Sequence, residues 1–444
     1  MLLDNLIQNS HFIIPVSVFT VALAAIIFDF FDKALIAMAG SAILVATGVM
    51  NFEEAVHAVN FEIIALLAAM MIIVEIAKES GFFSLMSFKL AKYSKGNPFL
   101  IFLFFTTITG IVSAFLDNVT VILIVVPITV ALVRGLGYNP FPYVITEIMF
   151  ASIGGVLTLI GDPLNVLVGT AVGISFNSFL VHMALPVFGS MAIILTALYI
   201  AKWSELKPIH YDLSKLFLSN VLLKKIEYKH KRTRLNTRYI VTVVGVLLLT
   251  ILGFLLQAKL QLPIAVIAMM GAFVLMFVVH KKIDVEHVFS TIEWGTLAFF
   301  AGLFVIVAGL QGSGAIDLMA NWLVGLTDNF NVLLLLILWG TAILSSVVNN
   351  IPLATVMIPI LFTITDHYST NPHVDLLWWA LILGCAFGGN ATMIGASANV
   401  VGAGIARKEG INITFLNYLR YSLPLTMGTM LLSTAYLLIW ANYF

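Results

Sequence analysis

The sequence predicts an all-α polytopic membrane protein made of two repeats with inverted topology. Its composition is 61% hydrophobic and 10% charged over 444 residues, with a mean hydropathy of +1.06, which no water-soluble domain of this length would tolerate. Apolar runs of about 17 to 25 residues, the length of a helix that crosses a bilayer, recur along the whole chain. Segments of the first half also recur, in the same order, in the second half.

Composition and motifs exclude several classes of function. The net charge is zero, so the chain offers no basic face for nucleic acid. The single cysteine, Cys385, rules out an internal disulfide and a multi-thiolate metal site, and no metal or other cofactor is expected. The N-terminal MLLDNLIQNSHF has no basic residue before the first apolar run, so we expect a short exposed tail rather than a secretory signal. The motifs HExxH and GxSxG are absent, and LIGD at Leu159 lacks the first glycine of an intramembrane aspartyl protease motif, so no enzyme is predicted.

The apolar runs predict about ten spanning helices, two re-entrant hairpins and two interrupted helices. The first repeat occupies residues 1–201, with scaffold helices in 12–80, a hairpin at 99–134, an interrupted helix at 143–173 and a helix at 179–201. A basic linker follows at residues 202–238. The second repeat occupies residues 239–444, with scaffold helices in 239–312, a hairpin at 332–364, an interrupted helix at 376–406 and a helix at 421–440.

Two pairs of matching segments indicate the repeat. SAFLDNVTVILIVVPI at Ser113 recurs as SSVVNNIPLATVMIPI at Ser345, an offset of 232 residues. ASIGGVLTLIGDPLNV at Ala151 recurs as CAFGGNATMIGASANV at Cys385, an offset of 234 residues, and the glycine pair and the asparagine near its end are identical. Matches in one order at nearly one offset indicate duplication of a unit of roughly 200 residues.

The distribution of basic residues favours one of two topologies. If both hairpin segments crossed the membrane, the chain would be a plain bundle of about twelve helices with parallel halves. If they turn back, the halves are inverted. With the linker in the cytoplasm, all 22 Lys and Arg residues except Lys259 then fall on the cytoplasmic side. The positive-inside rule therefore favours inverted halves with both termini outside, in what we expect to be a prokaryotic plasma membrane; the plain bundle is the alternative.

The broken segments predict a binding site for a polar solute near the membrane midplane. Non-helical backbone at that depth is tolerated only where it is buried in protein or lines a polar cavity. A half-helix that begins there offers N–H groups to anions and hydroxyls, and one that ends there offers carbonyl oxygens to cations. Glycine permits the unwinding and a close approach of backbones. The expected helix-break glycines are Gly154, Gly155, Gly161, Gly388, Gly389 and Gly395.

Asp117 and Asp162 are the predicted ion-coupling residues. Their counterparts in the second repeat are Asn349 and Ala396, so a structural need shared by both repeats does not explain the two carboxylates. A carboxylate inside the membrane costs at least a few kcal/mol and is by default a functional hypothesis. We expect the pair to exchange the driving cation, H⁺ or Na⁺.

Amides and hydroxyls at both breaks are predicted to bind the solute. They are Asn118, Thr158, Asn165, Asn349, Asn350, Thr392, Ser397 and Asn399. Because the asparagines recur symmetrically, binding is the favoured role, and the simpler alternative is that they only cap half-helices. Two other acidic residues, Glu75 and Glu147, lie nearer to helix ends and are expected to be solvated.

The motifs SAFLDNVTVILIVVPIT, IGDPLN and SSVVNNIPLATVMIP resemble those of the ion transporter superfamily over nearly the whole chain. The branch they resemble most is that of the melanosomal P protein, arsenite permeases and NhaD-type antiporters, which is related to the citrate and dicarboxylate transporters. The resemblance implies a secondary transporter in which a transport domain moves like an elevator against a scaffold. The dicarboxylate branch carries Ser-Asn-Thr at its hairpin tips, whereas this chain has Asp117-Asn118-Val119 and Asn349-Asn350-Ile351.

The solute is predicted from the scarcity of basic residues near the breaks. Between Lys95 and Lys202 the only basic residue is Arg134, and none lies between Lys282 and Arg407. A small hydroxylated solute such as arsenite or antimonite, exported in exchange for protons, fits this better than a polyanion. The alternatives are cation-coupled transport of citrate-type or dicarboxylate anions and Na⁺/H⁺ antiport. Besides solute, coupling ion and lipid bilayer, the partners considered are a second copy in a homodimer and, for an arsenite pump, a soluble ATPase.

Overall fold

The computed structural model describes residues 2–28, 30–201, 206 and 237–443, and within them the chain is helical, with no β-strand. The all-α prediction is confirmed. Five described helices are long and apolar enough to cross a membrane, or six if the bent pair Phe52–Ala58 and Phe61–Glu79 counts as one span. Most of the other predicted spans are apolar helices of 10–17 residues, several of them half-helices. The predicted linker at residues 202–238 lies almost entirely outside the described residues.

The first scaffold segment consists of α1 (Leu2–Ile27), α2 (Lys33–Ala46), α3 (Phe52–Ala58), α4 (Phe61–Glu79) and α5 (Phe82–Ser94). Polar residues cap the starts of α2, α3 and α4, because the first N–H groups of a helix need acceptors. The side chain of Asp32 accepts from Ala34 N at the start of α2, and that of Asn60 accepts from Ile63 N at the start of α4.

The second scaffold segment consists of α13 (Thr237–Leu255), α14 (Gln257–Leu260), α15 (Ile264–Val279), α16 (Val285–Ser290), α17 (Trp294–Gly312) and α18 (Ala315–Val324). It packs directly on the first segment, with α17 along α2 and α15 along α4. A Cβ at Gly302 would lie 2.6 Å from the carbonyl carbon of Ala37, so glycine allows α17 and α2 to touch backbone to backbone. The two scaffold segments therefore form one body.

The remaining helices form two hairpins and two interrupted helices. In the first repeat these are α6 (Pro98–Ser113), α7 (Asn118–Gly135), α8 (Phe141–Gly155), α9 (Pro163–Val172) and α10 (Phe176–Ala201). In the second repeat they are α19 (Phe330–Ser345), α20 (Asn350–His367), α21 (Leu376–Gly388), the 3₁₀ turn η1 (Gly389–Ala391), α22 (Ser397–Lys408) and α23 (Phe415–Tyr443). The first break is residues 156–162 and the second break is residues 389–396.

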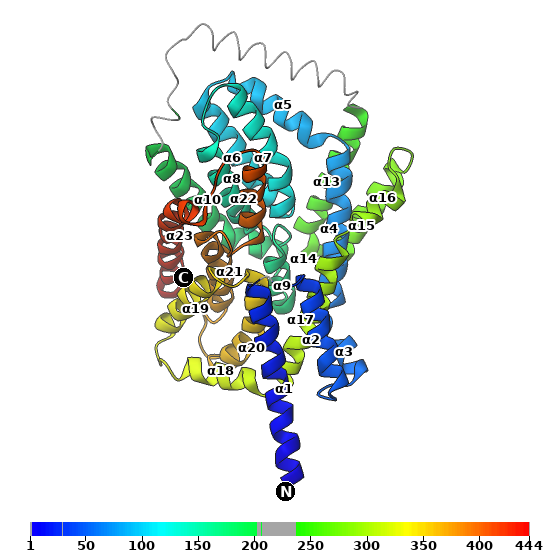
Figure 1. The fold of residues 1–444 in the computed structure, drawn as a ribbon, viewed down its shortest axis with the longest axis vertical. Coiled ribbons are helices and arrows are strands. Elements are labelled where there is room, and N and C mark those ends of the chain that lie inside the picture. Colours follow the sequence, from blue (N-terminus) through cyan, green and yellow to red (C-terminus); the bar gives the residue numbers. More distant parts are fainter. Residues whose placement is uncertain (1, 29, 202–205, 207–236, 444) are drawn as a thin grey trace.

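The two repeats interlock around the breaks. Figure 1 shows the first hairpin, α6–α7, toward the upper end of the molecule with α5, and the second hairpin, α19–α20, toward the lower end with α18. Helix α22 packs on α7 and α8, and α20 packs on α9, so each half-helix after a break contacts the other repeat. Each hairpin also packs on its own interrupted helix, α6 on α8 and α19 on α21. Both hairpin tips are thereby held next to the breaks.

Candidate ion and solute site

The tip of the first hairpin meets the first break at a carboxylate–amide pair. Asp117 caps α7 by accepting from Thr120 N (3.0 Å), and Asp162 caps α9 by accepting from Leu164 N through Oδ1 (2.9 Å). Asn118 Nδ2 donates to the other oxygen, Oδ2, of Asp162 (2.9 Å). Asp162 is 4% exposed and Asn118 is 8% exposed. The fold thus brings three of the predicted site residues together within the protein.

One serine in each hairpin donates a hydrogen bond to the interrupted helix of the same repeat, and the two bonds are equivalent. Ser113 Oγ donates to the carbonyl oxygen of Ala151, and Ser345 Oγ donates to that of Cys385, both at 2.6 Å. The threonines of the breaks repeat the pattern one residue further along each hairpin. The hydroxyl of Thr158 donates to Ala114 O, and the hydroxyl of Thr392 donates to Ser346 O. These four matched bonds fix both tips in equivalent positions.

Asn165 and Asn399 close the two breaks. Asn165 Nδ2 donates to Gly155 O (2.8 Å) and Thr158 O (2.7 Å). Asn399 Nδ2 donates to Gly389 O (3.0 Å) and Thr392 O (2.9 Å). Both side chains are fully buried, and the Oδ1 atom of each has no hydrogen-bond partner among the described residues. Their amide nitrogens therefore hold the unwound backbone, while their oxygens stay available as acceptors.

The break glycines lie where three stretches of backbone converge. A Cβ at Gly161 would lie 2.5 Å from Gly155 O and 2.7 Å from Ser113 O. The equivalent atom at Gly395 would lie 2.5 Å from Gly389 O and 2.8 Å from Ser345 O. The ends of α8 and α21 are equally crowded, since a Cβ at Gly154 would lie 2.2 Å from Gly110 O and one at Gly388 would lie 2.3 Å from the Cα of Ala342. Any larger residue there would push the hairpins away from the breaks.

The two tips differ in charge although they match in geometry. In the second repeat, Asn349 takes the place of Asp117 and donates from Nδ2 to Ser397 Oγ (3.1 Å), while its Oδ1 caps α20 through Ile351 N (3.2 Å). Asn350 lies next to it and is 9% exposed. The first tip thus carries two carboxylates, and the second carries only amides and a hydroxyl. A cation suits the first tip, and a neutral hydroxylated group suits the second.

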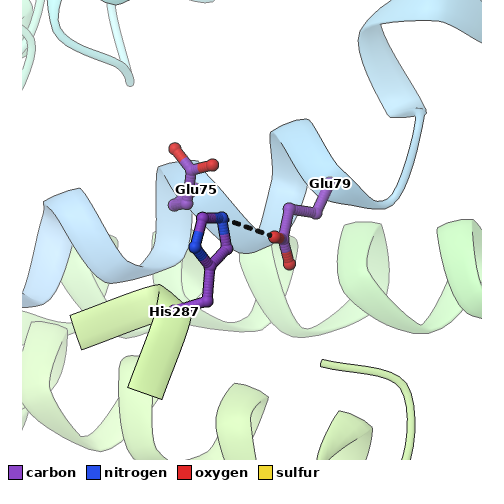
Figure 2. Close-up of side chains that lie close together, drawn as sticks. All are labelled: Glu75, Glu79 and His287. Atoms are coloured by element: carbon purple, nitrogen blue, oxygen red, sulfur yellow. Dashed lines mark ion pairs between the residues drawn. The ribbon is translucent and has the colours of Figure 1, made fainter. Parts of the chain in front are cut away.

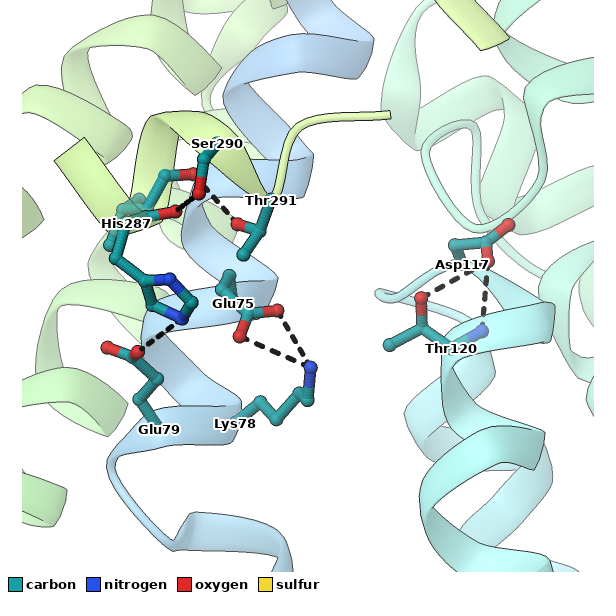
Figure 3. A network of polar contacts seen from close by, with 9 residues as sticks. Glu75, Lys78, Glu79, Asp117, Thr120, His287, Ser290 and Thr291 are labelled. Carbon is teal, nitrogen blue, oxygen red and sulfur yellow. Dashed lines mark hydrogen bonds and ion pairs between the residues drawn. The ribbon is translucent and has the colours of Figure 1, made fainter. Parts of the chain in front are cut away.

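A pocket of about 380 Å³, here called the vestibule, separates the first tip from the scaffold. Its walls include Asp117, Gly161 and Pro163 on one side and Glu75, Lys78 and Glu293 on the other. Figure 3 shows the pair formed by Glu75 and Lys78 (3.0 Å) facing Asp117 and Thr120 across this space. With three carboxyl groups against one ammonium group, the vestibule favours cations over anions.

Three acidic residues have environments that the sequence did not indicate. Glu147, expected to be solvated, is 0% exposed and accepts a hydrogen bond from the Thr129 hydroxyl (2.6 Å), so that expectation is wrong. Glu75 is mostly covered, with 15% of its side chain exposed, and is paired with Lys78. Glu293 went unnoticed because its position before a predicted span gave no sign that the fold would place it in the vestibule.

Among the described residues, one three-residue group could hold a metal. Glu75, Glu79 and His287 place one ligand atom each within 4.8 Å of one another at the junction of α4 and α16 (Figure 2). His287 Nε2 lies 3.5 Å from Glu79 Oε1. Glu75 is already engaged by Lys78, and both His287 and Glu79 are exposed. Surface groups in this arrangement form ion pairs without a metal, so we assign no metal here.

Duplicated helical halves, hairpins that meet broken helices and a buried polar site define a multi-pass secondary transporter of the membrane. Comparison with models of known protein families confirms this class and identifies the family. The chain belongs to the citrate transporter (CitMHS) family, whose model matches residues 23–384.

Known relatives agree with this assignment. The chain is 33% identical to a 46 kDa membrane protein of Mycobacterium leprae, covering 97% of this chain and 99% of that protein. It is 32% identical to an uncharacterized transporter of Mycobacterium tuberculosis, with the same coverage. It is 29% identical to the human P protein over 94% of this chain, which spans 58% of that longer protein. The predicted place in the ion transporter superfamily, near the P protein, is confirmed.

Two solved transporters share the fold. One is MtrF of Neisseria gonorrhoeae, with a TM-score of 0.57 and 15% identity over 90% of this chain and 84% of that chain. The other is YdaH of Alcanivorax borkumensis, with a TM-score of 0.51 and 16% identity over 86% and 85% of the two chains. At this level of identity they support the architecture alone.

Proposed function

We propose that this transporter exports a small neutral hydroxylated solute of the arsenite and antimonite class in exchange for protons. The observation that carries the proposal is the contrast between the two tips. Asp117, Asn118 and Asp162 form an acidic site at the first tip, and Asn349, Asn350 and Ser397 form a neutral one at the second. The acidic site exchanges the coupling cation, and the amides and hydroxyls of both tips hold the solute.

The carboxyl groups at the first tip are suited to cation exchange. Asp162 uses one oxygen to cap α9 and the other to accept from Asn118, so both oxygens are already ordered. Asp117 faces the vestibule and uses one oxygen to cap α7. A proton or Na⁺ that arrives through the vestibule reaches Asp117 first, and its binding removes negative charge from the site. H⁺ is the proposed coupling ion, and Na⁺ is the alternative.

The electrostatics of the vestibule argue against a polyanion as solute. Among the described residues that line it, Lys78 is the only basic one, and Glu75 holds it in an ion pair. A citrate-like anion would have to be neutralised by half-helix N-termini and bound cations alone. A neutral solute needs only hydroxyl and amide partners. The single cysteine fits export as well, because thiolate chelation would retain a trivalent arsenical that the transporter must release.

A citrate-type organic anion is the second candidate, and the match to the citrate transporter family favours it. Na⁺/H⁺ antiport is the third, because paired carboxyl groups alone suffice for it. We further propose that both termini lie outside a prokaryotic plasma membrane, that the vestibule opens to the cytoplasm, and that the hairpins and interrupted helices move as an elevator. No cofactor is required in this scheme; a homodimer, and a soluble ATPase for an arsenite pump, are the partners to look for.

Solute accumulation in everted membrane vesicles tests the proposal. Vesicles from cells that express the chain are energised with an imposed proton gradient and supplied in parallel with arsenite, antimonite, citrate, a dicarboxylate or Na⁺. We expect accumulation of arsenite and antimonite, and none in vesicles without the chain. Cation-dependent citrate or dicarboxylate uptake without an arsenite signal would move the assignment to the organic-anion branch.

A further inference from the structure

Glu147 is a buried carboxyl group for which the proposed site has no use. It lies in the middle of α8, eight residues before Gly155, which is about 12 Å along the helix from the first break. Its exposure is 0%, and so is that of Thr129 on α7, whose hydroxyl donates to Glu147 Oε1 at 2.6 Å. Its other oxygen, Oε2, is buried and makes no hydrogen bond among the described residues.

The second repeat shows that the fold does not need this pair. At the offsets of the two matching segments, Thr129 corresponds to Leu361 and Glu147 corresponds to Leu381. Both leucines are 0% exposed, on α20 and α21. Leucine therefore fills the equivalent space in an equivalent environment, where it packs without a polar group to satisfy. A buried carboxyl group costs free energy that a leucine would not, so packing does not explain Glu147.

No charged group among the described residues compensates Glu147. The helices packed against α8 are α6, α7, α10, α21 and α22, and α6 carries no titratable side chain. The titratable groups on these helices and on α8 itself are Arg134, Tyr143, His182, Tyr199, Cys385, Arg407 and Lys408. In the described structure none of them forms an ion pair or hydrogen bond with Glu147. As a carboxylate the group carries an unpaired charge, and as an acid it has an O–H at Oε2 without an acceptor, so neither state is fully satisfied.

Water has a route to the beginning of this helix. A pocket of about 430 Å³ opens between the α7–α8 connection and the segment that joins α22 to α23, and Arg134, Asn139, Phe141, Asn412 and Asn417 are among its lining residues. Glu147 lies six residues beyond Phe141, about 9 Å along α8. Glu147 is thus between this polar pocket and the first break, within the group of helices that carries both tips.

We propose that Glu147, hydrogen-bonded by Thr129, is a proton-binding site of the transport domain, separate from Asp117 and Asp162. On uptake, an O–H bond forms at Oε2 and the carboxyl group becomes neutral; on release, the proton returns to water. The inference rests on the proposed proton coupling and deepens it, because it adds one proton per cycle at a place remote from the solute.

Infrared spectroscopy of the purified full-length protein in lipid tests the proton site without any solute. A protonated carboxyl group gives a C=O stretching band that is resolved from the amide bands. We expect one C=O band of the wild-type protein to weaken reversibly as the pH is raised and to be missing in Glu147→Gln, while the bands of Asp117 and Asp162 remain. An identical spectrum in Glu147→Gln, or a band that does not respond to pH, would overturn the proposal.

A double variant separates proton binding from packing. Thr129→Leu combined with Glu147→Leu copies the leucine pair of the second repeat. We expect this variant to elute as a single species, to unfold at or above the wild-type temperature and to lack the infrared band. If the pair is purely structural, the double variant will unfold at a lower temperature and the Gln variant will keep wild-type coupling.

Transport then gives the stoichiometry. With the solute identified in the vesicle screen, Glu147→Gln is expected to move one proton fewer per solute and to show a flatter pH dependence than the wild type. A wild-type proton count in both variants would contradict the proposal. Because the infrared result does not depend on the solute, failure of the arsenite assignment leaves this test intact.

Discussion

Asn118 donates a hydrogen bond to Asp162 over 2.9 Å and so ties the tip of the first hairpin to the first interrupted helix. The two residues are 44 positions apart in the chain, and each also begins or caps a half-helix. A change in the charge of Asp162 therefore acts directly on the contact between hairpin and break. In the proposed mechanism, this contact gives a cation at the first tip a physical means of altering the solute site.

Asn165 and Asn399 are expected to contribute mainly to the stability of the folded protein, and less to its affinity for the solute. Asn165→Ala and Asn399→Ala each remove two hydrogen bonds to buried carbonyl oxygens of a break. We expect each variant to lose about 1–3 kcal/mol of stability, because buried acceptors lose their donor. Thermal unfolding in detergent measures the loss. Wild-type unfolding temperatures with weakened solute binding would instead assign both residues to binding alone.

The close approach of α8 and α6 is predicted to tolerate no side chain at Gly154. Gly154→Ala places a Cβ against the backbone of Gly110 and should cost about 1–3 kcal/mol or more. Gly245→Ala is the matched control, because Gly245 lies in α13 with no atom within 4 Å of an added Cβ. Thermal unfolding of the two variants should differ clearly in favour of Gly245→Ala. Equal unfolding temperatures would show that α6 and α8 can separate without cost.

The inverted topology is testable by cysteine labelling. Cys385 is buried, and replacing it by alanine, the residue at the corresponding position 151, gives a cysteine-free background. In that background Thr370→Cys, on the exposed loop between α20 and α21, should react with an impermeant maleimide added to intact cells. Lys408→Cys, at the end of α22, should react only in everted vesicles. Labelling of Thr370→Cys from the cytoplasmic side alone would rule out inverted halves.

The sequence predicted the parts of the site that follow from local patterns. The repeated Gly-Gly and Asn-Val segments predict both breaks. Glycine lets the backbone leave the helical conformation, and an asparagine at a fixed distance can hydrogen-bond the unwound backbone. Asp117 and Asp162 were predicted because a carboxylate is conspicuous in an apolar run. Their hydrogen-bond partners, and the vestibule that faces Asp117, depend on how hairpin and scaffold pack, which no local pattern reports.

The burial of Glu147 could not be predicted from local sequence patterns. Its position near the start of an apolar run suggested solvation, since distance from a helix end is the only depth measure that a sequence offers. The structure buries it because α6, α7 and α22 surround this part of α8. Comparison of the two repeats would have singled out Glu147. At the repeat offset it corresponds to a leucine in the second half, just as Asp162 corresponds to an alanine.

In the proposed mechanism, the carboxyl groups of the first tip couple solute movement to a cation. The most direct test compares wild-type protein, Asp117→Asn and Asp162→Asn in liposomes, measuring both gradient-driven arsenite accumulation and arsenite exchange without a gradient. Each variant keeps a polar side chain of the same size, so folding and exchange should persist while accumulation falls about tenfold or more. Full gradient-driven accumulation in Asp162→Asn and Asp117→Asn would contradict the claim.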